Sequence, residues 1–368
     1  MALRKVVLLK TVLLMVIVQC TFAFINVFYK LAQKDGMNLR IVIAYRYIFA
    51  SGFLVPMALL FEREGIRKID RIVIFQAFLS GLSGGAISQN LFLESLALTT
   101  ATFASAMANL IPGFTFVLAA LLRMEKVGLA KVAGTATGIA GAMILTFYKG
   151  VPLNFFPTRI NLLKNQSKDT VVSEHNNLIL GAAFSLGNCV FFSIWMIVQS
   201  KMIKRFPYPY TATALMVAQA AALSSGVALF LDRDLSNWAL GFNIRLAAVA
   251  YAGIVVSGIS ITLMTWSMRM SGPLFVSSFY PLMLIFSAII GLLLLGERLY
   301  LGSALGSLLI ICGLYLVLWG KANDMKSAIL EEKEGNMMTD IASLESIECR
   351  RDSSTDCTNK SSITEMKN

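Results

Sequence analysis

The sequence predicts an all-α integral membrane protein with ten transmembrane helices, arranged as two inverted repeats of five helices. Composition is the first observation behind this fold class. The chain is 57% hydrophobic and 14% charged, with a mean hydropathy of +0.70, which suits lipid rather than a globular surface. The second observation is a series of apolar runs of roughly 20 residues, the length that a helix needs to cross a bilayer.

The apolar runs divide the chain into two halves. They cover residues 8–31, 40–61, 72–95, 98–122, 129–148, 178–200, 210–231, 244–268, 272–296 and 300–320. The first run follows Arg4 and Lys5 but lacks a small-residue cleavage site, so we interpret it as an uncleaved span rather than a signal peptide. The predicted organisation is a first repeat at 1–150, a connecting loop at 151–177, a second repeat at 178–320 and a disordered polar tail at 321–368.

The two halves share a sequence register. A shift of 172 residues aligns Gly81 with Gly253, Ser88 with Ser260, Phe103 with Phe275, Glu125 with Glu297 and Gly141 with Gly313. Near the N-terminus the shift is 169, which aligns Gln19 with Asn188 and Cys20 with Cys189. Because each repeat has an odd number of spans, the second must be inverted relative to the first. Such repeats, with a binding site between them near mid-membrane, are typical of secondary transporters.

Basic residues predict the orientation of the helices. With the N-terminus in the cytosol, more Lys and Arg flank the cytosolic ends of the spans than the external ends, which is the bias that membrane proteins show. We therefore expect both termini in the cytosol. Asn165 begins a glycosylation sequon, and this topology places it in the external loop.

Several motifs resemble those of a known family. The segments NLIPGFTF at 109–116, RMEKV at 123–127 and GAMILTFYKG at 141–150 are similar to the first EamA domain of plant drug/metabolite transporters. The segments GERLYLG at 296–302 and GLYLVLWGK at 313–321 resemble the closing motif of the second domain. The likeness covers about residues 10–321, and the matching group is the nodulin-21-like, walls-are-thin-related (UmamiT) proteins.

This resemblance implies a ten-helix carrier with a central cavity lined by helices 1, 3 and 4 and their mates 6, 8 and 9. Members of the family move amino acids, often as facilitated exporters, and some move auxin or related indoles. They reside in the plasma membrane or the vacuolar membrane, and we favour the plasma membrane here. The resemblance leaves open the solute, the ion coupling and the oligomeric state.

Polar side chains at repeat-related positions are candidates for lining the cavity. Gln19, Asn26 and Lys30 share one face of helix 1, while Asn188 and Trp195 share the matching face of helix 6. Since unsatisfied amides are costly in lipid, both stripes should face inward. The alternative is hydrogen bonding between helices that only holds the bundle together. The remaining candidates for substrate binding are Gln89, Asn90, Asn109, Thr262, Trp266 and Tyr280.

Two charged residues are candidates for gating or selectivity. Lys30 and Glu94 lie toward the predicted outer ends of their spans, and Glu94 stands where the resemblance leads us to expect a small residue. An ion pair between them would gate the cavity or bind a zwitterionic solute. The alternative is a solvated outer rim, where long charged side chains reach water.

The ends of helices 4 and 9 carry a repeat-related pair of glutamates. Glu125 and Glu297 are expected to be structural, capping the turn into the following helix, with proton coupling as the alternative. Within the same helices, Pro112 and Pro281 predict interruptions of the backbone. Carbonyl groups exposed at such interruptions are common binding devices in carriers.

Several classes of function lack the residues that they need. The single His and the five Cys form no CxxC or His/Cys cluster, so we expect no metal and no cofactor. No acidic pair, intramembrane His or GxxxxGK[ST] loop is present, which argues against an enzyme and against an ATP-driven pump. The expected partners are a small-molecule solute and the lipid bilayer, not nucleic acid.

A nucleotide-sugar or sugar-phosphate translocator is an alternative within the same superfamily. Its site needs inward-facing cations for phosphate. In this chain Lys and Arg are expected almost wholly at the ends of spans, which disfavours that alternative.

Overall fold

The computed structural model describes residues 2–34, 38–99, 107–125, 127–148, 150, 152–153, 175–231, 238, 240, 244–294, 299–302, 304–324, 327 and 338. The side chains of Asn26 and Lys30 lie outside this description. The chain divides into two compact units, Met1–Leu318 and Trp319–Asn368. All packing reported below lies within the first unit.

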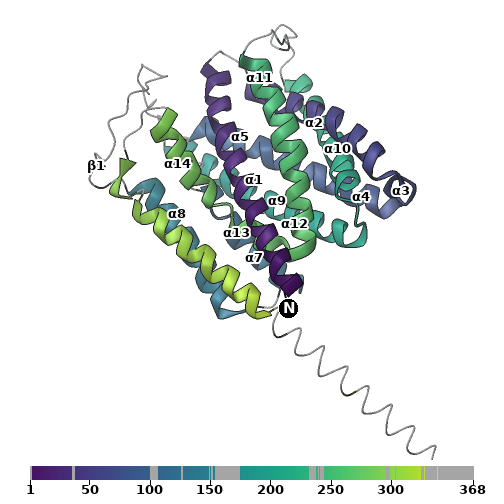
Figure 1. Cartoon of the computed structure of the whole chain (residues 1–368). Helices are drawn as coiled ribbons and strands as arrows, with labels where there is room; N and C mark the ends of the chain where they lie inside the picture. Colours follow the sequence, from purple (N-terminus) through teal and green to yellow (C-terminus); the bar gives the residue numbers. More distant parts are fainter. Residues whose placement is uncertain are drawn as a thin grey trace, which may run out of the picture. The chain divides into compact units, whose positions relative to one another are not determined.

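Eight helical elements form the first half of the described chain (Figure 1). They are α1 (Ala2–Lys34), α2 (Leu39–Phe61), α3 (Arg63–Arg67), α4 (Arg71–Ser80), the π-helix η1 (Gly81–Ile87), α5 (Ser88–Leu98), α7 (Ile111–Leu121) and α8 (Leu129–Phe147). Asn38 begins α2 by accepting a hydrogen bond from the Arg40 amide at 3.0 Å. Asp70 begins α4 in the same way, accepting from the Val73 amide at 2.7 Å. Both caps satisfy amides that lack a partner within the helix.

The described second half repeats this order. Its helices are α9 (His175–Arg205), α10 (Pro209–Leu231), α11 (Ile244–Ala250), the π-helix η3 (Tyr251–Ser260), α12 (Ile261–Ser271), α13 (Pro273–Ser278), α14 (Leu282–Leu294) and a last helix, Ala304–Asp324. Gly272 connects α12 to α13 with φ of 85°, a conformation that favours glycine. Strands β1 (Pro152–Leu153) and β2 (Leu299–Tyr300) pair antiparallel, with Pro152 opposite Tyr300.

The predicted set of ten helices agrees approximately with these elements. Within the described residues, nine helices are long and apolar enough to cross a membrane, and the shorter Ile111–Leu121 belongs to the predicted fourth span. The first part of that span, 100–106, lies outside the described residues. The third and eighth spans each contain a π-helix, and the shift of 172 residues places η1 inside η3.

Helices 4 and 9 are interrupted at repeat-related positions, as the prolines predict. The chain turns at Asn109 and Leu110 before α7, and at 279–281 between α13 and α14. The position of Pro112 is a correction to the expected mechanism. Pro112 is the second residue of α7, where a helix needs no amide donor, so the break precedes the proline instead of being caused by its missing hydrogen bond.

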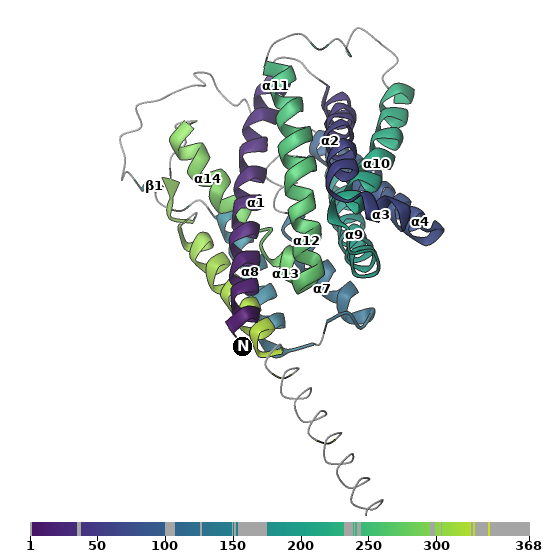
Figure 2. The ribbon, with the colours of Figure 1, turned by 45° about the vertical axis from the view of Figure 1, so that its right-hand side comes forward.

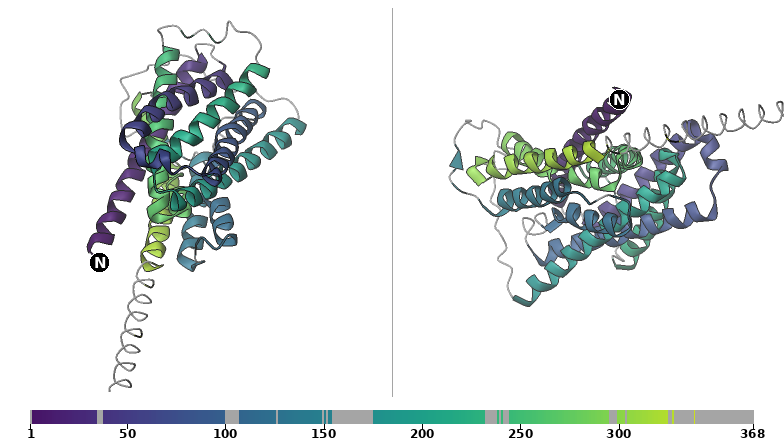
Figure 3. Two further views of the ribbon diagram at one scale, coloured as in Figure 1. Left: turned by 90° about the vertical axis from the view of Figure 1, so that its right-hand side faces the viewer. Right: turned by 90° about the horizontal axis from the view of Figure 1, so that it is seen from below.

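α8 and the last helix lie side by side (Figure 3). A Cβ atom on Gly134 would lie 2.7 Å from the Gly313 carbonyl oxygen, and one on Gly306 would lie 2.7 Å from the Gly141 carbonyl oxygen. Under the shift of 172 residues, each of these contacts is the image of the other. Small residues of this kind let two helices approach closely.

Helices of one half pack on helices of the other. α2 lies beside α10, while α1 contacts α11, η3, α12 and α14 (Figures 1 and 2). The repeat mate of α1, α9, contacts α4, η1, α5 and α7. The buried core between these helices includes Met15, Tyr47, Trp195, Met216 and Phe275. Any polar side chain on the inner faces of α1, α2 or α9 is therefore presented to the opposite half.

Candidate functional site

The two repeat-related amides of α1 and α9 are both buried, but their surroundings differ. Gln19 is 0% exposed, and neither its Oε1 nor its Nε2 has a hydrogen-bond partner among the described residues. Asn188 is buried and accepts a hydrogen bond from Ser88 of the other half at 2.8 Å. An unsatisfied buried amide costs about 1–3 kcal/mol. Gln19 is thus available for a ligand, whereas Asn188 also joins the halves.

Further hydrogen bonds connect the halves in the same region. Gln199 of α9 accepts from Ser80 at 2.7 Å and donates to Thr265 of α12 at 3.0 Å. Thr21 of α1 and Ser260 of η3 share a hydrogen bond of 2.8 Å. These contacts match the bundle-stabilising alternative for part of the polar stripe. They also gather α1, α4, α9, η3 and α12 around one buried polar region.

An aromatic cluster borders this region. Trp195 is buried beside Phe192, whose ring centroid lies 4.9 Å from that of Trp195 and 5.3 Å from that of Tyr280. The Trp195 indole nitrogen has no partner within the protein. Its ring fits against Gly84 of η1, where an added Cβ would lie 2.4 Å from the indole. The predicted candidates Trp195 and Tyr280 are therefore brought together across the break in helix 9.

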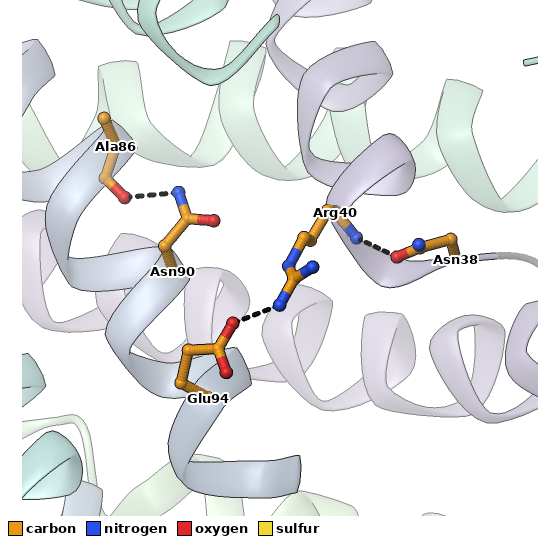
Figure 4. A network of polar contacts seen from close by, with 5 residues as sticks. All are labelled: Asn38, Arg40, Ala86, Asn90 and Glu94. Atoms are coloured by element: carbon orange, nitrogen blue, oxygen red, sulfur yellow. Dashed lines mark hydrogen bonds and ion pairs between the residues drawn. The ribbon is translucent and has the colours of Figure 1, made fainter. Parts of the chain in front are cut away.

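Other predicted candidates bond to their own helices or remain half-buried. Thr262 donates to the Gly258 carbonyl oxygen at 2.7 Å, and Asn90 donates to the Ala86 carbonyl oxygen at 2.8 Å (Figure 4). Gln89 and Trp266 are half-buried, and Asn109 is buried at the turn before α7. Asn26 cannot be placed, since its side chain lies outside the described residues.

Glu94 forms an ion pair with Arg40, which starts α2 (Figure 4). Their side chains are 37% and 31% exposed, respectively. The expected cation was Lys30, whose side chain lies outside the described residues. The described structure thus supplies a different partner for Glu94 and leaves the Lys30 contact a prediction. A half-exposed pair of this kind contributes little to stability, but it connects the start of α2 to α5.

Arg46 is the cation that sequence reasoning missed. It belongs to the predicted span 40–61 and is only 7% exposed. It donates from Nε to Ser257 of η3 and from Nη1 to the Tyr29 hydroxyl at 3.1 Å. The expectation that cations lie almost wholly at span ends is wrong here. The sequence did contain an indication of this inward-facing cation, because an Arg seven residues into an apolar run is costly unless its side chain faces the protein interior.

A second group of residues links the halves beyond the other end of α2, and we call it the clamp. Glu62 accepts hydrogen bonds from the backbone and side chain of Thr211 at 2.8 and 2.9 Å, at the start of α10. Asp70 pairs with Arg205 at 2.8 Å, at the end of α9. Glu62 and Asp70 come from the first half, and their partners come from the second. No pattern within either loop predicted these long-range contacts.

Asp70 of the clamp and the neighbouring Lys68 have shifted pKa values. The hydrogen bond to the Val73 amide, together with Arg205, lowers the pKa of Asp70. Lys68 donates to the Tyr208 hydroxyl at 3.0 Å, which raises the pKa of Lys68. Both shifts keep these groups charged over a wider pH range. Asp70 and Lys68 are therefore both charged near neutral pH.

Glu125 was expected to cap the turn into the next helix, but the N-cap position of α8 is Gly128 and no side chain caps it. Glu125 instead forms a buried ion pair of 3.2 Å with Lys131, in the first turn of α8. Removing one member of a buried pair costs about 3–5 kcal/mol, because the other charge stays buried. Its repeat mate Glu297 and the sequon residue Asn165 lie outside the described residues.

The described residues contain no cluster of three or more His, Cys, Asp or Glu side chains that could hold a metal ion. Cys20, Cys189 and Cys312 are free thiols. The chemistry of the buried region is instead hydrogen bonding and charge, supplied by amides, hydroxyls, an indole and a guanidinium.

Comparisons with known proteins agree with this architecture. A model of the EamA-like transporter family matches the chain twice, over residues 9–147 and 179–319. The WAT1-related protein At1g68170 of Arabidopsis thaliana is 41% identical over 329 residues, covering 87% of this chain and 92% of its own. The WAT1-related protein At1g25270 of the same plant is 37% identical over 350 residues, covering 92% and 99%.

A solved crystal structure has the same fold. It aligns with a TM-score of 0.64 at 16% identity and covers 85% of this chain and 97% of its own. At that identity the likeness concerns the fold alone.

Proposed function

Since this chain belongs to the EamA-like transporter family, we propose that it is a secondary carrier for amino acids or related small metabolites. It is a membrane transporter with several membrane-spanning helices. The proposal adds that it works by alternating access, as a facilitative or proton-coupled exporter. Binding takes place between the two halves, where inverted repeats expose one site to each side in turn.

One observation carries this proposal: polar side chains of both halves are buried where the halves meet. Gln19 and Arg46 come from the first half, and Asn188 and Trp195 come from the second. Two of the four, Gln19 and Trp195, keep side-chain donors or acceptors without a partner in the protein. Polar groups within membrane-spanning helices mark substrate pathways in transporters.

Contacts at the two ends of α2 support the alternating mechanism. Arg40 and Glu94 pair near its start, and Glu62 contacts α10 beyond its end. A carrier that opens to one side must break contacts at that side and keep those at the other. With the predicted orientation, the Arg40–Glu94 pair belongs to the external end and the clamp to the cytosolic end, in the plasma membrane.

Indole acids such as auxin are the second candidate class of solute. The observation that favours them is the aromatic group of Phe192, Trp195 and Tyr280, in which the Trp195 indole nitrogen has no hydrogen-bond partner among the described residues. Planar aromatic solutes gain from stacking on such rings. Amino acids and indole acids differ in size and charge, so one transport panel separates them.

The test is uptake and efflux of labelled amino acids and indole acids in cells that express the chain. We expect flux of at least one class above that of empty cells. Trp195→Ala and Asn109→Ala should lower that flux at unchanged surface abundance. A fall in abundance that accounts for the whole fall in flux would favour the packing role, and no flux across the panel would contradict the proposal.

A further inference from the structure

Arg46 is a buried cation without a counterion in the described part of the chain. Its contacts there are the hydroxyls of Ser257 and Tyr29 and the ring of Tyr47, 5.5 Å from the guanidinium carbon. All three are neutral, and no described carboxylate lies within 4.0 Å. A buried charge is ordinarily paired, because leaving water without compensation is costly. The described residues around Arg46 therefore supply no negative charge to balance its guanidinium, and an anion would do so.

Packing of the helices does not require a cation at position 46. A Cβ on Gly253 would lie 2.8 Å from the Arg46 carbonyl oxygen, and one on Gly81 would lie 2.9 Å from the Met216 carbonyl oxygen. Gly81 and Gly253 are repeat mates, so Arg46 and Met216 occupy equivalent places in the two halves. The second half fills this place with a thioether. A positive charge is therefore present at only one of the two equivalent positions, and helix packing at this place does not depend on it.

The place of Arg46 suits a ligand shared by both halves. It is seven residues into α2, about 10 Å along the helix from Leu39. Its Nε contact belongs to the second half, through Ser257 of η3, while Tyr29 belongs to the first. Nη2 makes no hydrogen bond with the described residues. A guanidinium with free N–H groups matches the two oxygens of a carboxylate, which it binds with parallel hydrogen bonds.

We propose that Arg46 binds the carboxylate of the transported solute, with the hydroxyls of Ser257 and Tyr29 completing the site. This inference rests on the proposed function and narrows it to organic acids. It applies equally to the carboxylate of a free amino acid and to that of an indole acid.

The experiment compares acids with amides of nearly the same shape, in which a neutral carboxamide replaces the carboxylate. The probes are phenylalanine with phenylalaninamide, and indole-3-acetate with indole-3-acetamide. They are assayed for transport and for thermal stabilisation of the purified full chain. We expect the wild type to prefer the acid of at least one pair by about tenfold or more, and Arg46→Met to abolish that preference. Arg46→Lys should recover it in part, since an ammonium keeps the charge but loses the planar fork.

Arg63→Met is the matched control, because Arg63 is exposed and, among the described residues, its side chain hydrogen-bonds only to the Leu59 carbonyl oxygen at the end of α2. It should keep the wild-type preference. The inference is overturned if the acid and the amide give the wild type equal transport and equal thermal stabilisation. It is also overturned if Arg46→Met keeps the wild-type preference for the acid. If Arg46→Met fails to fold, Ser257→Ala and Tyr29→Phe replace it, and each should weaken the preference for the acid.

The two measurements separate this inference from the proposed function. Thermal stabilisation by an acid but not by its amide, lost in Arg46→Met, supports the binding site even when no probe is transported. In that case the carrier proposal for these solutes fails alone. Transport of acid and amide at equal rates has the opposite meaning: the carrier proposal stands and the role of Arg46 is refuted.

Discussion

At the scale of single residues, two buried glutamines provide a matched test of the binding site. Gln19 has no partner for its amide, whereas Gln199 bonds to Ser80 and Thr265. We expect Gln19→Leu to raise the thermal unfolding temperature, because it removes an unsatisfied buried amide worth about 1–3 kcal/mol, and to lower transport. Gln199→Leu should lower the unfolding temperature. Destabilisation by Gln19→Leu would show that Gln19 has a structural partner.

Glu94 is the second residue with a testable role. Its half-exposed pair with Arg40 contributes about 0–1 kcal/mol, so Glu94→Gln should leave abundance unchanged. We expect it to change the apparent affinity for substrate or the preference among solutes. The double variant Arg40→Met with Glu94→Leu should be milder than the worse single variant, because no charge is left unpaired.

The Lys30 prediction is resolved by the same assay. Replacing Arg40→Met by Lys30→Met in the double variant tests which cation is functionally coupled to Glu94. Unchanged transport of the whole panel by Glu94→Gln would assign this residue to a solvated rim.

At the scale of elements, the crossing of α8 with the last helix depends on particular glycines. A Cβ on Gly141 would lie 2.8 Å from the Ile310 amide nitrogen, whereas one on Gly138 would meet nothing within 4 Å. Gly141→Ala should therefore cost about 1–3 kcal/mol through overpacking. Gly138→Ala should be neutral or stabilising, since Ala favours the helix. Thermal unfolding of the purified proteins measures both, and equal loss in the two variants would refute the close crossing.

The cap of α4 predicts a dependence of stability on pH. Hydrogen bonding to Val73 and the Arg205 charge lower the pKa of Asp70 in the folded protein. A lowered folded-state pKa adds stability above the ordinary value of 3.8, and this stability is lost as the pH falls through the folded-state value. Wild type should therefore unfold at a higher temperature than Asp70→Asn near neutral pH, with the difference shrinking below about pH 4. A difference that stays constant into acid would contradict this account.

At the scale of the whole molecule, the orientation in the membrane is the prediction to test. The charge bias and the inverted repeats place both termini in the cytosol and Asn165 outside. A cysteine introduced at position 165 should react with an impermeant reagent in intact cells. Cysteines placed near either terminus should react only after permeabilisation. Labelling of position 165 only in permeabilised cells would reverse the assignment.

Much of the architecture was predictable because it rests on local chemistry. Apolar runs of membrane length, together with an internal register of 172 residues, predicted the fold class and the inverted order of the helices. Pro112 and Pro281 indicated that helices 4 and 9 are interrupted, although the break in helix 4 precedes Pro112.

Only the tertiary structure decided which polar groups are satisfied. Gln19 and Asn188 are equivalent in sequence register, yet one lacks a partner and the other meets Ser88, which is 100 residues away. Glu94 finds Arg40 across 54 residues, and Arg46 faces Ser257 across 211. Hydrophobicity and helix period are properties of neighbouring residues, so the sequence by itself determined the spans and their symmetry. Charge pairing depends on which helices touch, and that is determined only when the two halves pack together.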